Sequence, residues 1–170
     1  MNTKNYVKKS LLLAFTGLII PIIIYPLFHE LGHVLSAIVL GVKVTEISFN
    51  PLENYSCVTE VTNGVKQIVV GFSGYLLPTA VSLIFKPKRF LLTYSCILFK
   101  IICIYSMILN VFYCLDFKNC FALKNDVTTI IHTEPNVLPI ILVFALTYIF
   151  IAVRSIIKSN FILQLNKFYA

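Results

Sequence analysis

The sequence predicts an all-α polytopic membrane protein of about four transmembrane helices, with a small β-hairpin after the first. Composition is the first reason, because 58% of the 170 residues are hydrophobic and only 12% are charged, whereas roughly a quarter are charged in soluble domains. The second reason is a set of apolar runs near the roughly 20 residues that cross a hydrocarbon core as a helix. Together these observations exclude a soluble enzyme, a disordered tail and a nucleic-acid-binding module.

The apolar runs recur along the whole chain without a long linker or a repeat between them. The first resembles a secretory signal, but no small-x-small cleavage site follows before Phe28, so we expect an uncleaved anchor. A single integral membrane domain over residues 1–170 is therefore expected. Its spans are expected at residues 11–40, 67–85, 90–115 and 137–157.

A short hairpin is predicted directly after the first span. Val42, Val44, Ile47 and Phe49 bring β-branched and aromatic side chains, and Asn50-Pro51 then marks a turn. A second β-branched stretch follows at residues 57–61. Two such stretches on either side of a turn signal indicate an antiparallel pair.

The net charge of +7 is a topological signal, because the basic residues flank the apolar runs instead of forming one patch. Residues 41–66 and 116–136 each hold two lysines and three carboxylates. The excess of lysine and arginine elsewhere predicts a multi-pass protein with both termini and the loop around Lys88 in the cytoplasm. The residues that carry this excess are Lys4, Lys8, Lys9, Lys86, Lys88, Arg89, Arg154, Lys158 and Lys167.

The five cysteines, at positions 57, 96, 103, 114 and 120, have no metal-binding spacing. Those in the third span are expected to act as small apolar residues. Cys57 and Cys120 fall on the same predicted side of the membrane and could pair, although free thiols are the expectation for all five.

The residues that carry chemistry are His29-Glu30-Leu31-Gly32-His33. On a helix, two histidines four residues apart share one face, so both imidazoles can reach one zinc ion while the glutamate reaches its water. The alternative is a structural histidine pair solvated among the headgroups. The apolar surroundings of the motif argue against a structural pair. A charged residue inside a bilayer costs about 3 kcal/mol and is by default a functional candidate. Zn²⁺ is therefore the predicted cofactor.

A catalytic zinc takes three protein ligands, so one more must come from elsewhere. Two crossings separate the histidine-bearing end of the first span from the connection after the third, and the two therefore lie on the same side. That connection holds Asp116, Asp126, His132 and Glu134, and all four are chemically suitable. Asn125 or Asp126 is also typical of the N-cap of a short helix through His132.

Several features occur together in the order of a known family. Phe28 to His33 lies in the first apolar helix, a hairpin-like segment follows, and Gly71-Phe72-Ser73-Gly74-Tyr75 opens the second span. Asn110 lies near the end of the third span, and Asn125-Asp126 follows. Over roughly residues 20–130 the chain thus resembles the site-2 protease family of intramembrane zinc metallopeptidases, in its short, membrane-only form.

The resemblance implies roles for particular residues. It points to Asp126 as the third zinc ligand beside His29 and His33, and to Asn110 as an amide that orients the substrate. Val127 follows Asp126 where the family commonly has glycine, and no proline lies between Asn110 and Asp126. Asp116 is therefore kept as the alternative third ligand.

The predicted function is zinc-dependent endoproteolysis of a membrane-protein substrate within or beside the lipid bilayer, with Glu30 as the general base. The alternative is a catalytically inactive site-2-protease-like membrane protein that binds or escorts a partner, because fold does not determine function. A zinc transporter is a weaker reading, since the other spans lack a series of carboxylates or histidines. No nucleic-acid partner is expected.

Overall fold

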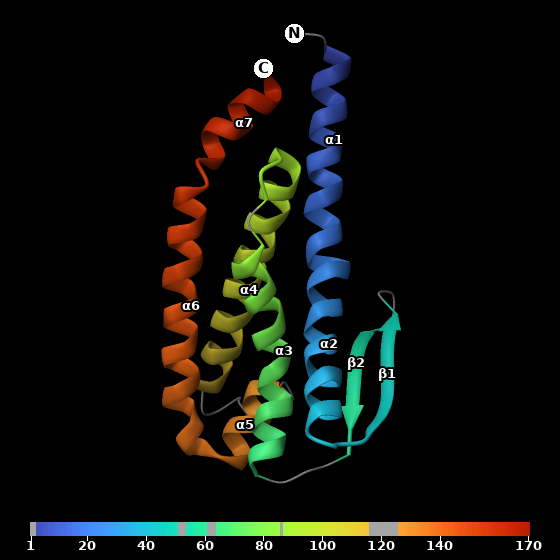
Figure 1. Cartoon of the computed structure of the whole chain (residues 1–170), viewed down its shortest axis with the longest axis vertical. Helices are drawn as coiled ribbons and strands as arrows, with labels where there is room; N and C mark the ends of the chain where they lie inside the picture. The colour runs from blue at the N-terminus through green and yellow to red at the C-terminus, as the bar shows by residue number, and fades with distance from the viewer. Residues whose placement is uncertain (1–2, 51–53, 61–63, 86, 116–125) are drawn as a thin grey trace.

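A computed structural model describes residues 3–50, 54–60, 64–85, 87–115 and 126–170, and they are mainly helical. The long helices run side by side along the long axis of the molecule (Figure 1). In chain order the elements are α1 (Thr3–Ile19), the π-helical turn η1 (Ile20–Ile24), α2 (Tyr25–Val39), β1 (Val44–Asn50), β2 (Asn54–Thr59), α3 (Val65–Ile84), α4 (Phe90–Leu115), α5 (Asp126–Thr133), the 3₁₀ turn η2 (Pro135–Val137), α6 (Leu138–Lys158) and α7 (Phe161–Tyr169).

Four helical stretches of the described residues are long and apolar enough to cross a membrane. They are Thr3–Val39, Val65–Ile84, Phe90–Phe112 and Pro135–Lys158. Many of their large apolar side chains face outward, for example Leu11, Phe112 and Phe150, which are more than 60% exposed. Such surfaces suit lipid and not water, so the prediction of an all-α polytopic integral membrane protein is confirmed.

The first stretch is one long helix with an irregular turn in its middle. At 37 residues and 1.5 Å per residue it is about 55 Å long, well beyond a hydrocarbon core of about 30 Å. Pro21 lies in the π turn, where its missing N–H and its ring are accommodated by the wider winding. The turn ends directly before α2, the helix that carries the histidine motif.

The predicted hairpin is confirmed, with β1 and β2 antiparallel and Ile47 opposite Cys57. It lies alongside α2, with β2 between α2 and β1 (Figure 1). Val42, just before β1, is buried with Ala37 of α2 and Val70 of α3. This small cluster ties the hairpin to the two helices that form the site.

The main core lies between α3, α4 and α6, where Tyr75, Cys103 and Tyr148 are buried together. The short helix α5 joins it through Ile130, which is 1% exposed. A Cβ atom added at Gly71 of α3 would come within 3.0 Å of the Ile130 side chain, so α5 rests closely on α3 there. That contact places the start of α5 beside α2.

Candidate metal centre

The middle of α2 presents His29 and His33 on one face, one helical turn apart, as their spacing predicts. The Nδ1 atom of His33 lies 2.7 Å from the carbonyl oxygen of Val70 on α3. Because a carbonyl only accepts hydrogen bonds, Nδ1 must donate, and in the neutral ring the lone pair of His33 is then on Nε2. The second ring nitrogen thus faces the site in the form that binds a metal.

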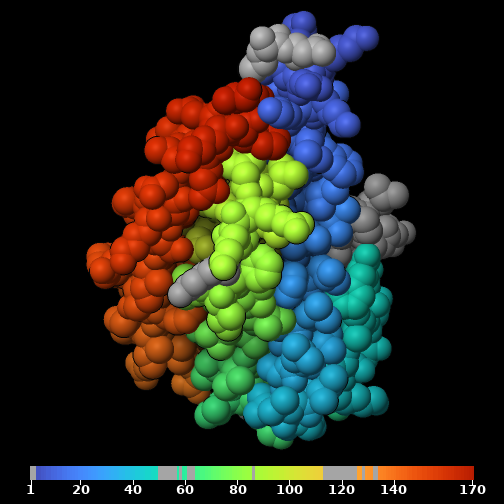
Figure 2. Space-filling view, turned by 45° about the horizontal axis from the view of Figure 1, so that its top comes forward, coloured from blue at the N-terminus to red at the C-terminus, as the bar shows by residue number. Residues whose placement is uncertain are grey.

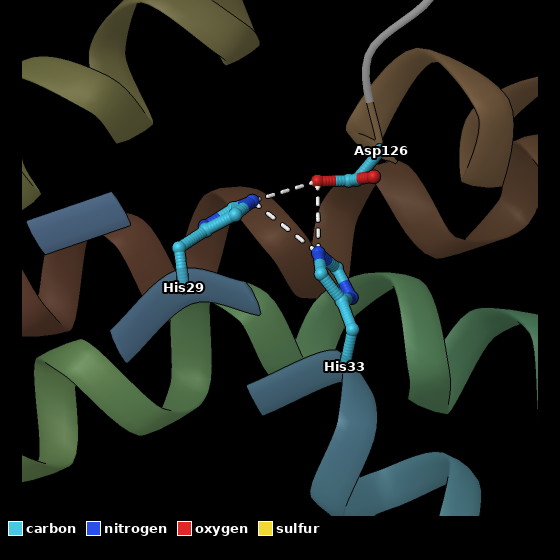
Figure 3. Close-up of side chains that lie close together, drawn as sticks. All are labelled: His29, His33 and Asp126. Carbon is cyan, nitrogen blue, oxygen red and sulfur yellow. Dashed lines mark hydrogen bonds and ion pairs between the residues drawn. The ribbon is translucent and has the colours of Figure 1, made fainter. Parts of the chain in front are cut away.

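The third member of the cluster is Asp126, the first residue of α5, which is 97 positions from His29. Its Oδ2 atom lies 2.9 Å from His29 Nε2 and 3.2 Å from His33 Nε2. The two Nε2 atoms are 3.3 Å apart. Figure 3 shows both rings and the carboxylate converging on one point from α2 and α5.

These separations suit a shared zinc ion. Donors at roughly 2 Å from a tetrahedral zinc are about 3.3 Å from one another, close to the three distances between the nitrogen and oxygen atoms. One candidate ligand atom from each of His29, His33 and Asp126 lies within 4.8 Å of the others. Two imidazoles and a carboxylate are also a usual zinc donor set. The residues present therefore fit the cofactor.

The carboxyl group of Asp126 is held in its charged form. Burial by itself would raise its pKa, but the two histidines, when protonated, donate hydrogen bonds to it and add opposite charge, which outweighs burial and lowers the pKa well below its usual range. A metal ligand must be deprotonated, so this environment keeps the carboxylate ready to bind.

Small residues let α3 approach α2 at the site. A Cβ atom at Gly74 would collide with the rings of His33 and His29, and one at Gly32 would collide with the backbone of Ser73. The hydroxyls of Ser36 and Ser73 meet at 2.6 Å across the same interface. The close approach of α3 to the histidine helix therefore depends on small side chains at this interface.

Glu30 lies on α2 between the two histidines and is 8% exposed. The strand β2 packs against α2, and Cys57 of this strand lies near the Glu30 carboxylate. The glutamate is not part of the three-residue cluster. It is thus covered by the hairpin and remains available for a role other than that of a ligand.

Two aromatic contacts of His29 were not predicted from the sequence. Its ring packs edge-on against Tyr75 of α3, with centroids 4.9 Å apart, and Tyr25 lies at 6.0 Å. The Nδ1 atom of His29 is buried and has no hydrogen-bond partner among the described residues. The position of Tyr75 in Gly71-Phe72-Ser73-Gly74-Tyr75 is the only sequence signal that could have indicated this contact.

The other candidate residues from the sequence lie outside this cluster or outside the described residues. Asn110 donates through Nδ2 to the carbonyl oxygen of Ser106, 2.7 Å away on its own helix. Glu134 precedes η2 and is outside the cluster of possible ligands. The structure does not describe Asp116, Cys120 or the side chain of His132, so the alternative third ligand stays a prediction. Cys57 is a free thiol, as expected, and does not form the possible pair with Cys120.

The fold is that of a polytopic helical membrane protein, and its candidate site gathers two histidines and an aspartate beside a buried glutamate. The Peptidase M50B-like family model matches residues 10–166, and the chain belongs to this family. Membership agrees with the resemblance to site-2 proteases. Comparisons with curated proteins and with solved structures gave no match.

Proposed function

We propose that this protein is a zinc-dependent intramembrane endopeptidase that cleaves a membrane-protein substrate. The observation that carries the proposal is the convergence of His29, His33 and Asp126 within ligand distance, one residue from a buried glutamate. Membership of a peptidase family supports the same conclusion.

In this proposal the zinc ligands are His29 Nε2, His33 Nε2 and an oxygen of Asp126. Three protein ligands leave a further position open, as in other catalytic zinc sites. When bound, zinc supplies Lewis acidity, which polarises a carbonyl group and lowers the pKa of water. The protein holds the donors in place through Val70, which orients His33, and through the contact of α5 with α3.

Glu30 is the proposed general base. It accepts a proton from the attacking water as the carbon–oxygen bond forms, and it donates that proton to the amide nitrogen as the carbon–nitrogen bond breaks. The reaction then yields one new carboxyl group and one new amine, and Glu30 returns to its starting state. Its burial beside the hairpin excludes most bulk water from this transfer.

The proposed substrate is a membrane-spanning segment that is locally unwound. A transmembrane helix hides its carbonyl groups in its own hydrogen bonds, so hydrolysis requires the segment to open where it meets the site. Four apolar helices place this protein in the same lipid environment.

The decisive test compares wild type with Glu30→Gln in cleavage of a membrane-spanning substrate by purified protein. Loss of a general base is expected to slow cleavage by about 100-fold or more, while zinc content stays the same. Glu46→Gln, at an exposed glutamate of β1, is the matched control and should cleave like wild type. Equal cleavage by Glu30→Gln and wild type would refute hydrolysis through Glu30. If the Glu30 variant also kept its cellular function, a non-hydrolytic protein that escorts a partner would be the better description.

Asn110 is proposed to orient the substrate. Within the described part of the chain one N–H of its amide is used, in α4, so we expect the other N–H and the amide oxygen to meet an extended peptide. We expect Asn110→Ala to raise KM about tenfold, the order of one or two lost hydrogen bonds, without loss of zinc. Cleavage kinetics together with metal analysis measure both effects, and unchanged KM would rule out this role.

A further inference from the structure

A pocket of about 520 Å³ is lined by the end of α3, the α3–α4 connection, α4 and α6, and it includes none of the three residues of the metal centre. Among the described residues its lining includes the basic side chains of Lys100, Arg154 and Lys158 and no acidic one. We call it the cationic pocket. Figure 2 shows this end of the molecule, where the light-green α3–α4 connection lies between α1 on one side and the orange and red α6 and α7 on the other.

Lys100 is the unusual member, because it is only 5% exposed. It lies ten residues after the start of α4, about 15 Å along the helix. A buried ammonium group is costly unless an anion accompanies it. Among the described residues, no carboxylate forms an ion pair with Lys100, Arg154 or Lys158. The pocket therefore concentrates positive charge that the described part of the chain does not neutralise.

The other walls of the pocket are largely apolar and lie at the level of a membrane boundary. Leu83, Ile97 and Ile151 line it. It is situated where α3 ends at Ile84, α4 begins at Phe90 and α6 ends at Lys158. Each of these residues is at one end of a candidate membrane span, so Arg154 and Lys158 lie near the headgroup region, whereas Lys100 lies deeper, among the apolar walls.

We propose that the cationic pocket binds the phosphate headgroup of an anionic phospholipid. Lysine and arginine are the usual partners of phosphate oxygens, and basic pockets between transmembrane helices on the cytoplasmic side are suited to anionic headgroups. A zwitterionic headgroup fits less well, because no acidic residue in the described part of the lining can accept its ammonium group. A free phosphate ion would leave the apolar walls without a partner. The lipid satisfies both surfaces.

The test uses the full-length protein purified in detergent, with native mass spectrometry to count bound lipids. Wild type is expected to retain phosphatidylglycerol at least about tenfold more strongly than phosphatidylcholine, as expected for several basic contacts. Arg154→Gln/Lys158→Gln should lose this preference. The matched control is Lys88→Gln/Arg89→Gln, which removes the same charge from exposed residues at the same end of the molecule but outside the pocket. The control should keep the preference.

Three results would overturn the proposal. Equal retention of the two lipids by wild type would exclude recognition of the anionic headgroup. Equal losses in the pocket and control variants would reduce the effect to general electrostatics. Displacement of phosphatidylglycerol by millimolar inorganic phosphate, with the same increase in thermal stability, would identify a site for free phosphate instead.

If Arg154→Gln/Lys158→Gln does not fold, two other measurements still test the proposal. Lys100→Met keeps most of the apolar stem of the side chain and should lose the preference for phosphatidylglycerol. In wild type, phosphatidylglycerol should raise the melting temperature and phosphatidylcholine should not; the reverse results contradict the proposal. Neither measurement depends on zinc or on proteolysis, so failure here leaves the proposed peptidase function intact.

Discussion

His33 illustrates how single residues of the site are set by neighbours from other helices. Its Nδ1 atom donates to Val70 on α3, and its Nε2 atom faces Asp126 of α5. The motif spacing predicted that His29 and His33 share a face, because helix geometry is local. The partner carbonyl belongs to a residue 37 positions away, and no local pattern could have indicated it.

The choice of third ligand is also made at the level of a residue. We expect Asp126→Ala to weaken zinc binding by about 100-fold or more, because it removes a direct ligand. Loss of a residue that only hydrogen-bonds to a ligand already lowers metal affinity by about 10–100-fold. Asp116→Ala is the matched comparison and should bind zinc like wild type. Zinc content and affinity of both purified variants measure this. Loss of zinc from the Asp116 variant alone would instead make Asp116 the third ligand.

At the level of elements, the site depends on how closely α3 approaches α2. Gly32 and Gly74 occupy the contact, where a Cβ atom would meet backbone or an imidazole ring. The sequence contains both glycines but does not show which rings they would accommodate. The hairpin was predicted from its β-branched stretches and turn residues, whereas its place alongside α2, over Glu30, comes from packing against Ala37 and Val70.

Gly74→Ala tests this element contact. Its Cβ atom would displace the His33 ring, so we expect a loss of about 1–3 kcal/mol in the free energy of unfolding from overpacking and at least tenfold weaker zinc binding. Gly17→Ala is the matched control, because the nearest atom to its Cβ is 3.4 Å away and alanine favours a helix. Thermal melting and zinc titration compare the two. Normal zinc binding by Gly74→Ala would show that the rings tolerate a shift of α3.

At the level of the whole molecule, both termini lie at the same end of the bundle (Figure 1). An even number of crossings requires this arrangement. We propose that residues 1–170 form a single integral membrane metallopeptidase-like domain, because α7 returns to pack on α1. The rings of Tyr6 and Tyr169 are 5.0 Å apart, and Lys9 lies over the ring of Phe168. These contacts join the first and last helices of the chain.

Orientation in the membrane is a further prediction at this scale. The distribution of lysine and arginine places both termini in the cytoplasm. Epitope tags at the two termini should therefore be protected from protease in intact cells, whereas a tag inserted between β1 and β2 should be digested. Termini on opposite sides would contradict four crossings. Both termini outside would reverse the orientation and leave the number of crossings unchanged.

The sequence by itself determined the membrane helices, the hairpin and the shared face of His29 and His33. These features follow from local hydrophobicity and backbone periodicity, which neighbouring residues set alone. Only the tertiary structure brought Asp126 to the histidines, Gly74 beneath their rings, and Lys100 into a pocket with Arg154 and Lys158. Each of these three placements depends on contacts between segments that are distant in the sequence, because the packing of the helices decides which polar groups lie next to one another.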